Sequence, residues 1–255
     1  MDNYVTIQVN EEFTYNLYKA SNTIWYFDNL IENEFVGYNS VKFKNKDDVF
    51  VWLESVKIDG KNYKGILAET GQLEIISRSD AIDWMIIENQ RMIGGYTIRH
   101  YFDMLSDDEK VNFEIECGYR IDHGNDFFKA DCSTAEGAIV ALENFYSEKN
   151  LDGVLSCKDF DLEAENILLE SKLEPNVDTH NKIKSILRIS LLEELEMNGF
   201  PNFENIERVF TVLNRHKDQK LIEERIIYPD GFMIINKFWV GLTKNEGWKV
   251  LNLVD

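Results

Sequence analysis

The chain has 255 residues, 44% of them hydrophobic and 13% aromatic, which is enough to bury the core of one or two domains. Its 46 acidic and 27 basic residues give a formal net charge of −19, and a field of this sign disfavours binding to nucleic-acid phosphates or anionic lipid. No segment approaches the roughly 18 apolar residues of a membrane span, and the acidic first residues do not resemble a signal peptide. We therefore expect a cytosolic protein whose charge either maintains solubility or attracts a basic protein partner.

The first part of the chain predicts one helix followed by a small antiparallel sheet. Apolar residues recur at helical spacing over residues 21–35, with a cap among residues 21–23. This apolar stripe consists of Ile24, Phe27, Ile31 and Phe35. Two hairpins are then predicted, with turns at Asp59-Gly60 and Asn89-Gln90, and the last strand is expected to extend over residues 91–102. A small curved sheet or barrel with flanking helices results.

A capping box and an irregular stretch close this first part. Ser106 precedes Glu109 by three residues, which predicts the start of a short helix. Residues 122–132 show no hydrophobic period and are interpreted as a linker. The predicted first domain is therefore residues 1–121, and the second is residues 133–255.

The second part predicts helices followed by strands. Ser133 and Glu136 form another capping-box pattern before a helix, and two short helices are expected over residues 151–170. A longer helix is predicted before Gly199, which takes the C′ position. Its inward stripe is Ile183, Ile186, Leu187, Leu191 and Leu195. From residue 204 onward four meandering antiparallel strands are predicted, so the fold class is α+β with two domains, the second a cone of helices and curved sheet.

Two family resemblances rest on quoted segments. The run "VFVWLESVKIDGKNYKGILAE", followed by "AIDWMIIENQRMIGGYTIRHYFDMLSDDEK", resembles the bacterial family called domain of unknown function 2314. The segment "STAEGAIVALENFYSEKNLDGVLSCKDF", with helices preceding a curved meander, resembles the cone-shaped nuclear transport factor 2-like superfamily. That second resemblance implies a cone that serves as a ligand pocket, as in ketosteroid isomerases, or as a non-enzymatic module.

The candidate binding residues surround a glycine pair. Because a strand is expected after Gly94-Gly95, a phosphate-binding loop is disfavoured, and the pair indicates a bulge or a close backbone approach. Trp84 is expected in the core. A small polar binding site is hypothesised from Asp83, Trp84, Thr97 and Arg99, although structural pairing explains these residues as well. Asp107, Asp108 and Glu109 form a second candidate, an acidic patch for a basic partner.

Other chemistries find little support in the residue pattern. The four histidines are scattered without metal-ligand spacing, and the three cysteines fit neither CxxC spacing nor a disulfide framework, so no metal and no cofactor are predicted. No GxSxG turn occurs, so covalent catalysis is disfavoured. Glu223, Glu224 and Tyr228 are the residues considered for isomerase-like acid–base chemistry, and strand alternation explains them equally well.

The sequence favours a non-catalytic, protein-binding role, of the immunity or regulatory type. The alternative is a small-ligand-binding or isomerase-like second domain that uses the cone pocket. A deep cone with several polar groups would favour the alternative, whereas a filled cone and an exposed acidic, apolar-centred patch would favour protein binding.

Overall fold

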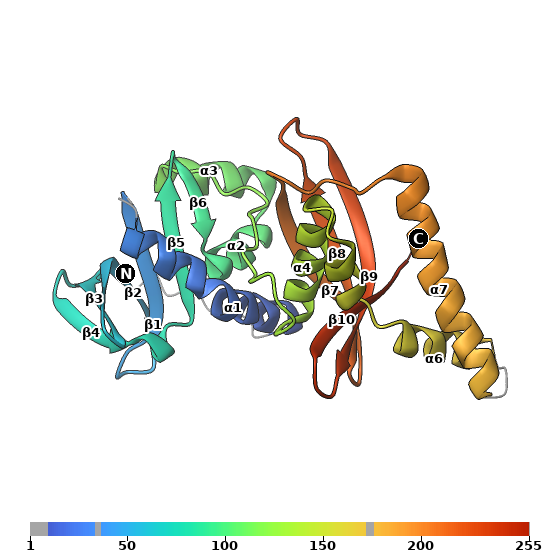
Figure 1. Ribbon diagram of the computed structural model, residues 1–255. Helices are drawn as coiled ribbons and strands as arrows, with labels where there is room; N and C mark the ends of the chain where they lie inside the picture. Colours follow the sequence, from blue (N-terminus) through green and yellow to red (C-terminus); the bar gives the residue numbers. More distant parts are fainter. Residues whose placement is uncertain (1–9, 34–36, 172–175, 255) are drawn as a thin grey trace. The chain divides into compact units, whose positions relative to one another are not determined.

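The computed structural model describes residues 10–33, 37–171 and 176–254 (Figure 1). The chain divides into two compact units, residues 1–127 and 128–255. The division falls inside the stretch 122–132 that was interpreted as a linker, and that stretch contains no helix or strand. Whether each unit folds by itself stays a prediction.

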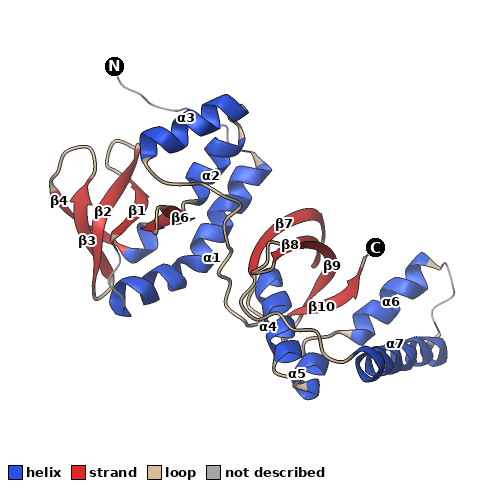
Figure 2. Ribbon diagram, turned by 90° about the horizontal axis from the view of Figure 1, so that it is seen from above, coloured by secondary structure: helices blue, strands red, loops and turns tan. Residues whose placement is uncertain are grey.

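The first unit combines one long helix with a six-stranded antiparallel sheet in the order β4-β3-β2-β1-β5-β6 (Figure 2). The elements are α1 (Glu11–Asn33), β1 (Tyr38–Lys44), β2 (Phe50–Asp59), β3 (Asn62–Leu67), β4 (Leu73–Ser77), β5 (Asp83–Glu88), β6 (Arg91–Gly94), α2 (Tyr96–Asp103) and α3 (Asp107–Cys117). Both predicted turns are confirmed, since Asp59 pairs with Asn62 and Glu88 pairs with Arg91. The sheet is open between its edge strands, so the barrel alternative is wrong.

Helix α1 begins ten residues earlier than predicted. Asn10 caps it, its Oδ1 accepting from the Phe13 N–H at 2.7 Å, whereas the predicted cap residues 21–23 lie inside the helix. The Thr23 hydroxyl donates instead to the Lys19 carbonyl at 2.8 Å. Phe27 from the predicted stripe is fully buried, Ile24 and Ile31 are partly buried, and Phe35 lies outside the described residues.

The expected strand over residues 91–102 is wrong after its fourth residue. Gly94 and Gly95 both take positive φ, 72° and 65°, and helix α2 begins at Tyr96. A Cβ on Gly94 would lie 2.5 Å from the Trp84 carbonyl oxygen, so the close backbone approach inferred from the glycine pair is confirmed. Thr97 and Arg99 therefore lie on a helix, not on a strand.

Over its described residues, 128–171 and 176–254, the second unit contains four helices and a four-stranded antiparallel meander in the order β10-β9-β8-β7. The elements are α4 (Ala135–Ser147), α5 (Leu151–Ser156), α6 (Phe160–Glu170), α7 (Val177–Asn198), β7 (Glu207–His216), β8 (Gln219–Ile227), β9 (Met233–Thr243) and β10 (Gly247–Leu253). Helix α4 packs against β8, β9 and β10. This order of helices, then a meander, agrees with the prediction, and the sheet remains open.

Two details of these helices differ from the prediction. The cap of α4 is Thr134, whose Oγ1 accepts from the Gly137 N–H at 2.9 Å, so the predicted box of Ser133 and Glu136 is one residue out of register. The stripe predicted to face inward on α7 is buried only at Leu195, and Ile186 is 61% exposed. Helix α7 packs mainly on α6, which leaves much of its apolar surface uncovered.

Candidate functional site

The carboxylate of Asp83 caps helix α2 from inside the first unit. Asp83 is fully buried at the start of β5, and its oxygens accept from the backbone N–H groups of Trp84 at 2.8 Å, Tyr96 at 3.2 Å and Thr97 at 2.7 Å. The Thr97 hydroxyl donates a fourth hydrogen bond at 2.7 Å. The positive end of the helix is thus occupied by the protein's own anion. A bound phosphate has no place there.

Lys42 on β1 completes this group. Its Nζ donates to Thr97 Oγ1 at 3.1 Å and lies over the ring of Trp52. Burial lowers the pKa of Lys42 and raises the pKa of Asp83, and the attraction between the two charges opposes both shifts. The lysine thereby offsets part of the cost of burying the carboxylate.

Trp84 and Arg99 also make contacts within the first unit. The Trp84 ring is fully buried, and its Nε1 donates to Thr23 Oγ1 at 3.1 Å. Arg99 donates to the carbonyls of Gly94 at 2.9 Å and Met92 at 2.5 Å, and it pairs with Asp122 at 3.5 Å. The structure therefore brings Asp83 and Thr97 together. Arg99 instead links the carbonyls of β6 to Asp122, which follows α3. The ligand role of these four residues stays a prediction.

The acidic patch lies at the exposed start of α3. Asp107, Asp108 and Glu109 are all exposed, and Glu109 completes the predicted capping box by accepting from the Ser106 N–H at 2.9 Å. This hydrogen bonding lowers the pKa of Glu109. No residue of α3 is fully buried, and Val111 and Ile115 are 56% and 73% exposed one and two turns after Asp107. One face of α3 therefore combines two free carboxylates with two exposed apolar side chains.

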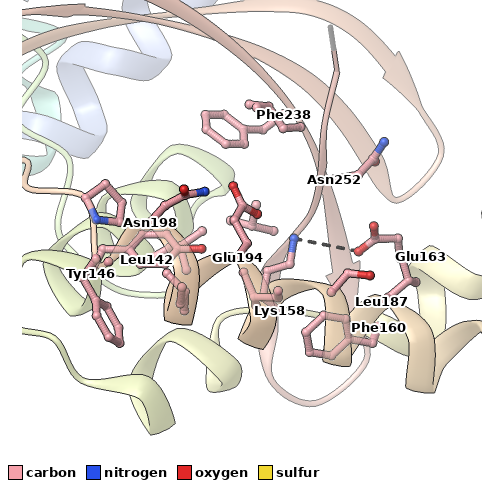
Figure 3. Close-up of a pocket in the computed structure, with 18 residues that line it drawn as sticks. Leu142, Tyr146, Lys158, Phe160, Glu163, Leu187, Glu194, Asn198, Phe238 and Asn252 are labelled. Atoms are coloured by element: carbon pink, nitrogen blue, oxygen red, sulfur yellow. Dashed lines mark ion pairs between the residues drawn. The ribbon is translucent and has the colours of Figure 1, made fainter.

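A cavity of about 500 Å³ opens in the second unit (Figure 3). Its apolar lining comes from α4, α6, α7, the chain after α7, and strands β9 and β10: Leu142, Tyr146, Phe160, Leu187, Leu191, Leu195, Phe200, Pro201, Phe238, Val250 and Leu253. Polar side chains are interspersed: Lys158, Glu163, Ser190, Glu194, Asn198 and Asn252. A volume of this size, with mostly apolar walls and a few polar groups, is typical of small-molecule sites.

Lys158 is the cation of this cavity. Figure 3 shows its side chain between Glu163 and Glu194, and its Nζ lies 3.8 Å from Glu163 Oε2. Burial lowers the pKa of Lys158, and the two carboxylates oppose that shift. Burial likewise raises the pKa of Glu163, although the lysine opposes it. None of these three residues was singled out from the sequence, because no local motif marks them.

A second group of buried charges lies between α4 and the sheet. Glu143 on α4 pairs with Arg208 on β7 at 2.8 Å, and Arg208 also lies 3.4 Å from Glu224 on β8. Burial and the neighbouring charge of Glu143 raise the pKa of Glu224 well above its ordinary value. Glu224 was among the residues considered for acid–base chemistry; its neighbour Glu223 is partly exposed, and Tyr228 follows the end of β8. None of these residues lines the cavity.

Metal ligation and thiol chemistry find no support in the described residues. Within residues 10–33, 37–171 and 176–254, no three His, Cys, Asp or Glu side chains are grouped so that they could hold a metal ion. All three cysteines are free, and burial raises the pKa of Cys157 to about 11, which disfavours the thiolate. No helix in the described part of the chain is long and apolar enough to cross a membrane.

The class defined by these elements is a mixed α and β protein with two open antiparallel sheets. Residues 10–121 match the model of the family described as "Uncharacterized protein conserved in bacteria (DUF2314)". The match confirms the resemblance predicted for the first part of the chain. No curated protein and no solved structure matches the chain, so the resemblance of residues 133–255 to the nuclear transport factor 2-like superfamily stays a prediction.

Proposed function

We propose that the second unit binds a small molecule in the cavity beside α7. The observation that carries the proposal is the cavity itself, about 500 Å³ in volume, with apolar walls from helices and strands and charged side chains at Lys158, Glu163 and Glu194. Burial of a ligand's apolar surface supplies affinity, and a few fixed polar groups supply orientation. This reverses the order favoured by the sequence, because a cavity with several polar groups was the criterion for ligand binding; the exposed acidic, apolar-centred face that was part of the criterion for protein binding is found on α3.

Binding without catalysis is the simpler form of this proposal. An isomerase-like reaction needs an acid or base that reaches the ligand. Glu224, whose pKa is strongly raised, is fully buried against Glu143 and Arg208 and does not line the cavity. Lys158 and Glu163, the titratable pair that does line it, face each other at 3.8 Å, so charge pairing and hydrogen bonding to a ligand are the simplest roles for them.

A cavity-filling variant tests the proposal with the neutral fluorescent dye Nile red as the probe. Leu191→Trp on α7 places a larger ring at the lining, whereas Ile189→Trp makes the matched change at a residue of the same helix that is 52% exposed and outside the lining. We expect Nile red fluorescence to be enhanced by the wild type and by Ile189→Trp, and to be lost with Leu191→Trp. Equal dye binding by the two variants would refute the cavity as the site.

A protein-binding role of the first unit is the second candidate. The observation that favours it is the exposed face of α3, where Asp107 and Asp108 adjoin Val111 and Ile115. An apolar centre with an acidic margin is suited to a basic protein, and the net charge of −19 would accelerate the encounter. The immunity or regulatory role proposed from the sequence depends on such a face.

A further inference from the structure

We infer that the cavity of the second unit selects an amphipathic ligand whose polar end is a protonated amine. The inference rests on the proposed function and specifies the ligand class. Three features of the cavity support it: the sum of its charges, a buried carboxylate oxygen without a hydrogen-bond donor, and the apolar character of the remaining walls.

The charged side chains of the lining carry one more negative than positive charge. Lys158 is opposed by Glu163 and Glu194, and the remaining polar side chains, Ser190, Asn198 and Asn252, are neutral. A ligand anion that approached Lys158 would meet the buried carboxylate of Glu163, 3.8 Å from the Lys158 Nζ, and in these desolvated surroundings the repulsion is weakly screened. A ligand cation brings the cavity to neutrality.

Glu163 provides the specific contact. Its side chain is 10% exposed, and its Oε2 atom has no hydrogen-bond partner among the described residues. The Lys158 ammonium is 3.8 Å away, which exceeds hydrogen-bond length. A buried carboxylate oxygen without a donor is costly, and turning the Glu163 carboxylate toward an N–H group of a ligand would remove that cost. Charge-assisted hydrogen bonds of this kind are among the stronger ones.

The walls away from these charges accept the body of the ligand. Leu191, Phe200 and Phe238 belong to a lining whose other members are mostly apolar, and Figure 3 shows Phe238 across the space from Lys158. Such walls favour an aliphatic or aromatic body over a second charged group. An amine with one polar end fits both regions.

Three probes of equal chain length test the inference by isothermal titration calorimetry: octylammonium, octan-1-ol and octanoate, each with the full-length protein near neutral pH. We expect octylammonium to bind at least about tenfold more tightly than octanoate, with octan-1-ol between them, since a hydrogen bond to a charged group contributes that much. Equal affinities, or a preference for octanoate, would overturn the inference while leaving cavity binding intact.

Charge-neutralising variants locate the interaction. Glu163→Gln should lower octylammonium affinity roughly tenfold and leave octan-1-ol unchanged, whereas Glu165→Gln, an exposed residue of the same helix α6 outside the lining, should alter neither. Glu194→Gln, at an exposed residue of α7, gives a second variant with the same expected direction if Glu163→Gln does not fold. Equal effects of the variants at 163 and 165 contradict the inference. If Nile red also fails to bind, the proposed function fails with it.

Discussion

The carboxylates of Glu143 and Glu224 meet inside the second unit and share Arg208 as their partner. Arg208 lies 2.8 Å from Glu143 and 3.4 Å from Glu224, and both glutamates are buried. One guanidinium neutralises one carboxylate, so burial and the charge of Glu143 raise the pKa of Glu224 well above its ordinary value. The contact between helix α4 and the sheet therefore contains a carboxyl group, that of Glu224, whose proton affinity depends on folding.

The first prediction concerns pH. Because the folded state binds the Glu224 proton more tightly than the unfolded chain, its contribution to the free energy of unfolding is complete below the ordinary Glu pKa, about 4.3, and is lost as the pH rises to the raised pKa. Glu224→Gln, which keeps a donor at every pH, should raise the thermal midpoint by several degrees at pH 8 and by much less at pH 5. Calorimetry at both values measures this. Glu223→Gln, at the partly exposed neighbour, is the control, and an equal effect of both changes would contradict the raised pKa of Glu224.

The second prediction concerns the cap of α2. Asp83→Asn removes the charge that accepts from Thr97 and faces Lys42, and it should lower the free energy of unfolding by about 1–3 kcal/mol. Asp80→Asn makes the same change at an exposed residue and should cost less than about 0.5 kcal/mol. Denaturant unfolding measures both. Similar midpoints for the two variants would show that the cap contributes little.

The third prediction ranks three glycines, all at positive φ. A Cβ at Gly71 meets nothing within 4 Å, so Gly71→Ala should cost only the conformational strain, about 1–2 kcal/mol. Gly95→Ala adds a contact at 2.6 Å with the flexible Met92 side chain, and Gly94→Ala adds one at 2.5 Å with the Trp84 backbone. The loss of stability should therefore increase in the order Gly71, Gly95, Gly94, as measured by denaturant midpoints. Any other order would mean that contacts do not set the cost.

These residues also explain how far the sequence could predict the fold. The hairpins depend on adjacent turn residues such as Asp59-Gly60, so the local sequence pattern was enough to predict them. Helix α2 depends on Asp83, a capping residue thirteen positions before Tyr96. The β-branched side chain of Thr97 favours a strand when only its sequence neighbours are considered. A contact between distant residues overrode the local preference.

The two charged sites of the second unit show the same limit. Alternation along β8 could place either Glu223 or Glu224 inside, and only the packing of α4 decides between them. The cavity exists because α7 leaves part of its apolar stripe away from the sheet. Standard helical periodicity predicted that Ile186 would be buried, and no local signal indicated otherwise.

The fourth prediction concerns protein binding by α3. Replacing Asp107 and Asp108 by lysine, with Glu109 kept because it binds Ser106, should lower the association rate with a basic partner isolated on the wild-type protein by roughly three- to tenfold. Dissociation should change less. Lysine at both Asp47 and Asp48, in the exposed loop before β2, makes the same net charge change elsewhere. Stopped-flow rates decide the matter: equal slowing by both double variants, or a rate indifferent to salt, refutes the α3 face.

The fifth prediction refines the boundary between the units. Asp126 is buried in an ion pair with Lys19 at 2.7 Å, and Phe127 stacks on Tyr26, so the first half of the linker is held by α1. Residues 129–131 are exposed. Trypsin should therefore cleave after Lys129 and release two folded fragments, detected by mass spectrometry, and Lys129→Gln should abolish that cut. Persistence of a single uncut chain, or prompt digestion of either fragment, would contradict two independently folding domains.

The position of α7 has a consequence for exchange kinetics. A helix that packs mainly on α6 and has little fully buried surface opens at a lower free energy than the strands of the sheet, so its amide protons should exchange with deuterium far sooner. A ligand in the cavity touches the side of this helix that includes Leu187 and Leu191. A ligand bound in the cavity should therefore slow deuterium uptake along α7. The rate of ligand entry would then be set by local opening of α7 rather than by unfolding of the core.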